Sequence, residues 1–165
     1  MIPLQTAPNP VAPGTRIGHV HLKVADLDRM LGFYSGVLGL SVMQRYGDEA
    51  AFLSDGRYHH AIGMNTWESK GGKRPPEGTT GLYHTAILYP DRAALGDALR
   101  RLDAAGWPLT GASDHGVSEA LYLDDPEGNG VELYFDRPEA EWPRDGQGRL
   151  AMVTRRLDLA ALRAA

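Results

Sequence analysis

Hydrophobic and polar positions follow the same order in two parts of the chain: a short strand-like stretch and then a segment with helical periodicity. Residues 17–24 and 82–89 contain the β-branched and aromatic residues that are typical of strands. Each stretch leads to an aspartate, Asp26 or Asp91, whose carboxylate can accept hydrogen bonds from free backbone N–H groups at a helix start. Apolar residues then recur at steps of three and four, which predicts helices over Leu27, Met30, Leu31, Tyr34 and Leu38 and over Leu95, Ala98, Leu99 and Leu102.

These two parts are related by an internal repeat. A shift of 65 residues superposes the strand-like stretches and places His19 on His84. Both helices are expected to end at a glycine, Gly39 or Gly106, where the chain must turn. The pattern therefore predicts an α+β fold of two tandem βαβββ modules. The three strand candidates after each helix are residues 41–46, 50–53 and 59–66 in the first copy and residues 109–110, 120–123 and 130–135 in the second.

Composition marks the segments that flank and join the modules. The start of the chain is rich in proline and lacks the basic and apolar regions of a signal peptide. A Gly- and Pro-rich stretch between the copies predicts a long connecting loop. The end of the chain is polar at first and then offers a strand candidate at 150–153 and a short leucine-rich helix. The predicted organisation is an extended arm (1–15), a first module (16–67), a connecting loop (68–80), a second module (81–138) and a C-terminal extension (139–165).

The composition is that of a globular protein, and it restricts the available chemistry. Of 165 residues, 42% are hydrophobic, and 17 basic against 21 acidic residues give a net charge of −4, which gives no reason to expect nucleic acid binding. No apolar run approaches the roughly 18 residues of a membrane span, so we expect a cytoplasmic protein. The absence of cysteine excludes thiolate nucleophiles, cysteine-based zinc sites and iron–sulfur clusters. The histidines that remain for metal or acid–base chemistry are His19, His21, His59, His60, His84 and His115.

His19 and His84 hold equivalent places in the repeat, so their imidazoles could point into one cavity if the two opening strands lie side by side. Glu132 is the best candidate for a third ligand, because it follows the turn Pro-Glu-Gly-Asn-Gly and its apolar neighbours face the other side of the strand. Such a carboxylate is costly to bury unless it is paired or bound to a metal. Two histidines and one carboxylate leave open coordination positions, as in non-haem Fe(II) oxygen chemistry.

Each of these residues also has a simpler interpretation. A single histidine on a strand is more often a hydrogen-bonded structural residue, and Glu132 could lie at an exposed strand edge. His21 lies on the same strand face as His19 and competes with it as a ligand. We favour His19, because only His19 has an equivalent in the second copy. His59 points to the opposite face from His60 and is expected to be structural or exposed.

Three motifs occur together: the His-headed repeat, the run Phe-Tyr-Ser-Gly-Val-Leu-Gly-Leu (33–40) and the ending Asp-Pro-Glu-Gly-Asn-Gly-Val-Glu-Leu (125–133). In this combination the chain resembles the vicinal oxygen chelate superfamily over residues 16–138. That group includes glyoxalase I, extradiol ring-cleavage dioxygenases and antibiotic-resistance proteins. The resemblance implies a mixed sheet curled around one divalent metal ion, with Fe(II) favoured and Mn(II), Zn(II) or Ni(II) as alternatives. The implied ligands are His19, His84 and Glu132.

Within the superfamily, the chain is most similar to catechol 2,3-dioxygenase-like proteins. Those enzymes have a tyrosine ten residues before the carboxylate ligand, where this chain has Tyr122, and a histidine on the last strand of the first module, matched by His60. His115 matches a further histidine with less regular spacing. The resemblance implies cleavage of a small catecholic substrate by O2, with His60 near dioxygen and with Tyr122 and His115 at the substrate hydroxyl. From the sequence alone, core packing explains Tyr122 equally well.

Two other functions share this fold. A glyoxalase I-like isomerase or lyase would use a second carboxylate on the last strand of the first module, but residues 58–66 contain no acid. A metal-free antibiotic-binding protein would have no need of the ligand set. The larger ring-cleaving dioxygenases carry four modules and this chain has two, which leaves open whether the site closes within one chain or across a homodimer.

Overall fold

Each half of the chain folds into a strand, a helix and three further strands, which confirms the α+β fold class. The computed structural model describes residues 9–165, so residues 1–8 of the predicted arm lie outside the described residues. The first module consists of β1 (Val20–Lys23), α1 (Leu27–Leu31) with its π-helical continuation η1 (Gly32–Val37), β2 (Ser41–Tyr46), β3 (Ala50–Ser54) and β4 (Ile62–Asn65). The second module consists of β5 (Thr85–Leu88), α2 (Arg92–Ala104), β6 (Gly111–Asp114), β7 (Ser118–Asp124) and β8 (Gly130–Asp136).

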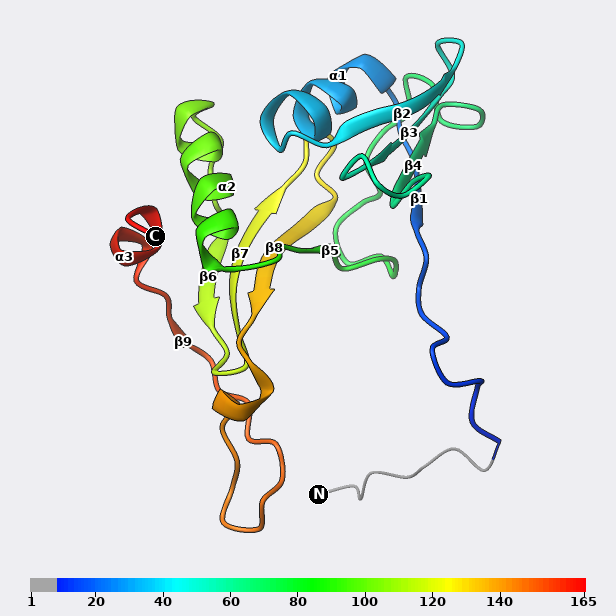
Figure 1. Ribbon diagram of the computed structural model, residues 1–165. Coiled ribbons are helices and arrows are strands. Elements are labelled where there is room, and N and C mark those ends of the chain that lie inside the picture. The colour runs from blue at the N-terminus through cyan, green and yellow to red at the C-terminus, as the bar shows by residue number, and fades with distance from the viewer. Residues whose placement is uncertain (1–8) are drawn as a thin grey trace.

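The strands form two mixed sheets, one in each module (Figure 1). The strand order is β1-β4-β3-β2 in the first sheet and β5-β8-β7-β6-β9 in the second, where β9 (Arg155–Arg156) belongs to the C-terminal extension. The opening strand of each module pairs in parallel with the last strand of the same module, β1 with β4 and β5 with β8. β1 and β5 are therefore edge strands of separate sheets and are not hydrogen-bonded to each other.

Both predicted helix starts and both predicted helix ends are present. The carboxylate of Asp26 accepts a hydrogen bond from the backbone N–H three residues further on at 3.0 Å, and Asp91 does the same at 2.8 Å. After η1 and after α2 the chain passes through Gly39 (φ 84°) and Gly106 (φ 64°), in the left-handed region that only glycine enters easily. The first helix differs from a regular α-helix, because it widens into the π-helical turns of η1 after five residues.

One hydrophobic core is shared by the two modules. Polar contacts across this core fix the turn between β7 and β8: the hydroxyl of Tyr34 donates to Asp125 at 3.1 Å, and the carboxylate of Glu127 accepts two successive backbone N–H groups before α1 at 2.8 and 2.9 Å. The turn that precedes Glu132 is thus held against the first module. The largest fully buried side chains come from both modules and from the C-terminal extension: Tyr34, Phe33, Met30, Leu53, Met64, Leu95, Leu99, Leu102, Leu121, Leu123, Leu133 and Leu162.

The C-terminal extension returns along the second module (Figure 1). After the 3-10 helix η2 (Glu139–Glu141), the chain forms β9 beside β6 and ends in α3 (Leu159–Arg163), which packs against α2. The predicted short helix is therefore present. The strand expected at 109–110 lies at β6, where it pairs along its whole length with β7. The strand expected at 150–153 lies at β9 instead, where it pairs with the other edge of β6.

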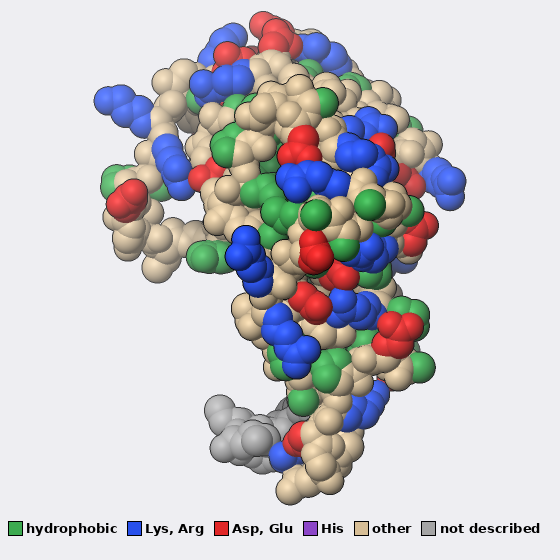
Figure 2. Space-filling model, turned by 90° about the vertical axis from the view of Figure 1, so that its left-hand side faces the viewer, with side chains coloured by type: hydrophobic (Ala, Val, Ile, Leu, Met, Phe, Trp, Pro, Cys, Tyr) green, Lys and Arg blue, Asp and Glu red, His purple; other side chains and the backbone are tan. Residues whose placement is uncertain are grey.

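The face of the molecule that carries α2 and α3 shows acidic and basic side chains interspersed (Figure 2). In the part of the chain that the structure describes, no histidine is visible on this face, so the candidate site lies elsewhere on the molecule. None of the helices within residues 9–165 is long and apolar enough to cross a membrane.

Candidate metal centre

Polar side chains line the face of the second sheet that points away from α2. Along β8, the residues Val131, Leu133 and Phe135 are buried in the core, and Glu132 between them points to the opposite face. Tyr122 on β7 lies directly across from Glu132 in the antiparallel ladder, so the two side chains share that face. The Tyr122 hydroxyl donates a hydrogen bond to Oε1 of Glu132 at 3.1 Å.

His84 reaches the same carboxylate from the neighbouring strand. It directly precedes β5, as His19 directly precedes β1, and its Nε2 lies 2.9 Å from Oε2 of Glu132. Gly130 permits this approach, because a Cβ at that position would lie 3.1 Å from the Cβ of His84. Nδ1 of His84 is buried and has no hydrogen-bond partner within residues 9–165.

The pair of His84 and Glu132 fits two ligands of one divalent metal ion. Two donor atoms that bind one ion at about 2.1 Å and at a right angle are about 3.0 Å apart, and the separation in the pair is 2.9 Å. An imidazole nitrogen and a carboxylate oxygen are donors that Fe(II), Mn(II) and Zn(II) all accept. The same spacing also suits a hydrogen bond from Nε2–H to the carboxylate in the absence of an ion.

His115 adds a further contact to these side chains. It lies in the turn between β6 and β7, and its Nε2 is 2.8 Å from the hydroxyl of Tyr122. Burial, and after it the negative charge of Glu132, raises the pKa of Tyr122 to about 12. The Tyr122 hydroxyl therefore keeps its proton at neutral pH and shares it with His115 or with Glu132.

The histidines of the first module form a separate cluster. The ring of His19 lies 4.4 Å from the ring of His60, measured between centroids, and the Nδ1 atoms of His59 and His60 are 2.7 Å apart. His60 lies in the bend before β4 and not on the strand itself. Burial, followed by the charges of the neighbouring histidines, lowers the pKa of His60, so this side chain favours the neutral form.

His21 makes a contact of its own inside the first sheet. Its Nε2 is 2.8 Å from Nδ2 of Asn65, and its ring lies over Gly63, where a Cβ would come within 2.8 Å of Nδ1. The contact with Asn65 occupies a nitrogen that His21 would otherwise offer to a metal ion. His19, which is exposed at the start of β1, remains the better candidate of the two.

The structure joins four of the six candidate residues and leaves His19 and His60 apart from them. The four form a polar row, a continuous series of contacts that consists of His84, Glu132, Tyr122 and His115. Within residues 9–165, no three His, Asp or Glu side chains are placed so that they could hold a metal ion. Two of the three predicted ligands, His84 and Glu132, lie next to each other in this row, and all three ligand assignments stay predictions.

A cavity of about 970 Å³ adjoins the polar row. Its walls come from the connecting loop, from His84 and Tyr122, and from the start of β8. The guanidinium of Arg74, at the beginning of this part of the loop, lies against Gly128, where a Cβ would come within 2.7 Å of it. The Gly- and Pro-rich composition predicts a loop here, but no sequence signal places that loop beside the sheet.

Sequence comparison agrees with this geometry. The chain matches the Glyoxalase/Bleomycin resistance protein/Dioxygenase superfamily over residues 16–133. The chain belongs to this superfamily. Members with curated descriptions include the catechol-2,3-dioxygenase of Bacillus subtilis (strain 168), which is 42% identical over 148 residues, or 90% of this chain and 51% of that protein. Biphenyl-2,3-diol 1,2-dioxygenase 3 of Rhodococcus globerulus is 35% identical over 124 residues, or 73% of this chain and 63% of that protein.

The fold is also that of solved structures from the superfamily. A glyoxalase/dioxygenase from Nostoc punctiforme superposes with a TM-score of 0.61 at 18% identity, over 81% of this chain and all of the other. Because the match covers only about half of the Bacillus protein, this superfamily member corresponds to part of its longer curated relatives.

Two contacts of this superfamily member were missed by sequence reasoning. The carbonyl oxygen of Val153 lies 3.0 Å from Nδ1 of His115, and no pattern reveals it, since the contact uses the main chain. Asp125 accepts two backbone N–H groups of its own turn, at 2.9 Å each, as well as the hydroxyl of Tyr34. A signal for Asp125 was present, because aspartate at the start of such a turn commonly bonds the backbone two residues on.

Proposed function

We propose that the chain is a metal-dependent extradiol-type dioxygenase that cleaves the ring of a small catecholic substrate with O2. The observation that carries the proposal is the polar row, in which an imidazole and a carboxylate, donors that suit a divalent metal ion, are followed by two groups that can carry a proton. The cavity beside the row has room for a small aromatic molecule. The names of the Bacillus and Rhodococcus relatives support the same class of reaction.

His84 and Glu132 would hold the metal ion, which we expect to be Fe(II). When bound, such an ion supplies adjacent open positions for the two oxygens of a catechol and for O2. Glu132 is well suited to this task because its second carboxylate oxygen accepts the hydrogen bond from Tyr122, which fixes the orientation of the carboxylate.

Tyr122 and His115 would act as the acid and base that remove and return the proton of one catechol hydroxyl. A positioned acid or base contributes typically about 10²- to 10⁴-fold to the rate of a step that moves a proton. Neutral His115 can accept a proton at Nε2, through the hydroxyl of Tyr122 at 2.8 Å. The high pKa of Tyr122, about 12, keeps the hydroxyl protonated, so its one proton stays available to His115, to Glu132 or to an oxygen atom of the substrate.

We infer that His19 joins the pair of His84 and Glu132 from a second copy of the chain. His19 is exposed before the edge strand β1, and the pair lies at the edge strand β5 of the other sheet. A two-fold axis would place His19 of each copy at the pair of the other, and both sites would then be complete. His60 would enter the site together with His19, because the two rings are in contact.

Mixed dimers test this arrangement. Chains with His19→Ala and chains with Glu132→Gln are co-expressed with different tags, and the bound metal is measured. In a site shared between copies, each mixed dimer regains one intact site, so roughly one quarter of the wild-type metal content is expected after statistical mixing. Mixed dimers that assemble but contain no metal would overturn the shared site. His19→Ala chains that bind as much metal as the wild type would overturn His19 as a ligand.

Oxygen consumption tests the reaction itself. The protein is loaded with Fe(II) under anaerobic conditions and mixed with a panel of catechols and air-saturated buffer. We expect equimolar uptake of O2 and catechol and a yellow ring-fission product. Glu132→Gln should abolish both, and Glu139→Gln, which changes an exposed glutamate on η2, should not. Metal-loaded protein that consumes no O2 with any catechol, or that isomerises a hemithioacetal instead, would contradict the proposal.

A further inference from the structure

The C-terminal extension contacts the polar row at His115, through the backbone of Val153 and the hydroxyl of Thr154. The backbone N–H of Val153 donates to the carbonyl oxygen of His115 at 3.1 Å, and the carbonyl oxygen of Val153 lies 3.0 Å from Nδ1 of the same histidine. We propose that Val153 is a positioning residue, whose carbonyl oxygen holds the proton of His115 on Nδ1 and thereby directs Nε2 to the hydroxyl of Tyr122. The consequence for turnover rests on the proposed function, but the position of the proton does not.

The proton positions follow from the partners of the two ring nitrogens. A backbone carbonyl can only accept, so the nitrogen of His115 that faces Val153 must carry a proton. In the neutral ring, Nε2 is then left to accept the hydroxyl proton of Tyr122. In the doubly protonated ring, Nε2–H donates to this hydroxyl, whose own proton turns to Oε1 of Glu132. The neutral ring thus competes with Glu132 for the single hydroxyl proton of Tyr122, whereas the doubly protonated ring leaves that proton to Glu132.

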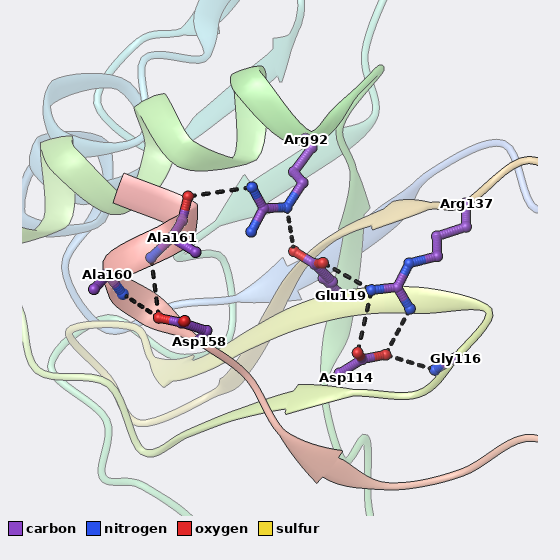
Figure 3. A network of polar contacts seen from close by, with 8 residues as sticks. All are labelled: Arg92, Asp114, Gly116, Glu119, Arg137, Asp158, Ala160 and Ala161. Atoms are coloured by element: carbon purple, nitrogen blue, oxygen red, sulfur yellow. Dashed lines mark hydrogen bonds and ion pairs between the residues drawn. The ribbon is translucent and has the colours of Figure 1, made fainter. Parts of the chain in front are cut away.

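A network of ion pairs, centred on the buried side chain of Glu119, holds the turn that carries His115 (Figure 3). Arg137 pairs with Asp114 at 2.6 Å and with Glu119 at 2.8 Å, and the carboxylate of Asp114 accepts the backbone N–H of Gly116 at 2.7 Å. The side chain of Glu119 is only 7% exposed, so its two ion pairs operate where water screens them little. The turn therefore has little freedom to move His115 away from Val153.

The same network reaches the end of the chain. Arg92 donates from Nε to Glu119 at 2.9 Å and from Nη1 to the carbonyl oxygen of Ala161 at 3.2 Å (Figure 3). α3, which contains Ala161, is capped by Asp158 and buries Leu162 completely. The extension is therefore anchored on both sides of Val153: before it, the backbone N–H of Ala151 donates to the carbonyl oxygen of Pro143 at 2.8 Å, and after it come the pairing of β9 with β6 and the packing of α3.

Close packing also joins the extension to the turn. Gly116 has φ 76°, and a Cβ at this position would lie 2.8 Å from Pro143 and 3.2 Å from Val153. Buried leucines and strand pairing already attach the extension to the second module without the help of His115. The hydrogen bond from the imidazole of His115 to Val153 therefore orients that ring within the polar row. The attachment of the extension does not depend on this bond.

The test weakens the Val153 carbonyl and leaves every side chain unchanged. An ester in place of the amide between Val153 and Thr154 makes that carbonyl a poorer acceptor. Because the chain contains no cysteine, residues 151–165 can be attached as a synthetic peptide at a cysteine in place of Ala151, which is afterwards desulfurised to alanine. The all-amide protein assembled in the same way is the matched control, and Thr154→Val removes the hydroxyl that lies 3.4 Å from Nδ1 as a second control.

Two readouts separate positioning from mere support of the fold. ¹⁵N-histidine NMR, with His115 assigned by comparison with His115→Asn, reports which ring nitrogen carries the proton. We expect the Nδ1–H tautomer in neutral His115 of the all-amide protein and of Thr154→Val, and a larger Nε2–H fraction in the ester. We further expect kcat for ring cleavage to fall roughly tenfold or more in the ester, as for the loss of comparable orienting partners, with KM and metal affinity unchanged.

The outcomes that overturn the proposal are equally distinct. An Nε2–H tautomer in the unmodified protein would do so alone, even if the ester protein fails to fold. An ester protein that folds and keeps both the tautomer and kcat of the control would also do so. The NMR readout requires no turnover. A protein that is inactive toward every catechol would therefore refute the proposed function, and the tautomer of His115 would still decide whether Val153 positions the proton.

Discussion

The hydrogen bond between Tyr34 and Asp125 joins the core of the first module to the turn that precedes Glu132. Tyr34 is fully buried in η1 and Asp125 is 4% exposed, and the hydroxyl donates to the carboxylate at 3.1 Å. Burial, and after it the charge of Asp125, raises the pKa of Tyr34, so the hydroxyl remains a donor. We predict that Tyr34→Phe destabilises the protein, because the substitution removes this donor while it keeps the ring in the core.

The size of the effect follows from the other partners of Asp125. Hydrogen bonds to charged groups contribute about 1.5–3 kcal/mol. Backbone N–H groups of Glu127 and Asn129 and the side-chain amide of Asn129 still reach the carboxylate, each at 2.9 Å, so we expect the lower end, about 1.5 kcal/mol. For a chain of this length, such a loss lowers the melting temperature by roughly 3–6 °C.

Thermal and urea unfolding of Tyr34→Phe measures this loss. Tyr46→Phe is the matched control, because Tyr46 is 68% exposed on β2 and the same hydroxyl is removed without a buried partner at stake. A Tyr34→Phe protein as stable as Tyr46→Phe would refute the reasoning, since the contact between the modules would then contribute nothing measurable.

Three further predictions concern the site, acid stability and the C-terminal extension. Tyr122→Phe should lower kcat for ring cleavage by about 10²- to 10⁴-fold with metal binding retained. An unchanged kcat would show that Tyr122 only packs against its neighbours and takes no part in the reaction. Hydrogen bonding from Arg137 holds the pKa of Asp114 below its usual value, so this pair stabilises the fold above about pH 4 and loses its effect as the pH falls further. Urea unfolding between pH 5 and 2.5 should show this loss in the wild type and less of it in Asp114→Asn. Leu162→Ala should cost about 2–5 kcal/mol, because Leu162 is fully buried, and a smaller cost in calorimetry would show that α3 is weakly attached.

The helices and the repeat were predictable because their signals are local. Asp26 and Asp91 bond to N–H groups three residues away, and Gly39 and Gly106 adopt positive φ for reasons that depend only on the adjacent backbone. The position of Tyr122 opposite Glu132 was also within reach, since a tight turn between two strands sets their register.

The arrangement of the two sheets was not predictable from such signals. It depends on contacts between residues about a hundred positions apart, such as the Tyr34–Asp125 hydrogen bond and the bonds from Glu127 to the backbone before α1. The repeat shows that His19 and His84 are equivalent, but equivalence says nothing about the distance between them. The contact of Val153 with His115 had no signal at all, because a backbone carbonyl is the same in every residue type.

A measurement of metal binding by the polar row tests the central claim most directly. Anaerobic calorimetry with Fe(II) or Mn(II) compares the wild type with His84→Ala and Glu132→Gln, and Glu139→Gln serves as the control for the loss of an exposed carboxylate. We predict one ion per chain in the wild type and in Glu139→Gln, and loss of binding in the other two variants. A wild type that takes up no ion, or a Glu132→Gln variant that binds as tightly as the wild type, would contradict the assignment of this row as a metal centre.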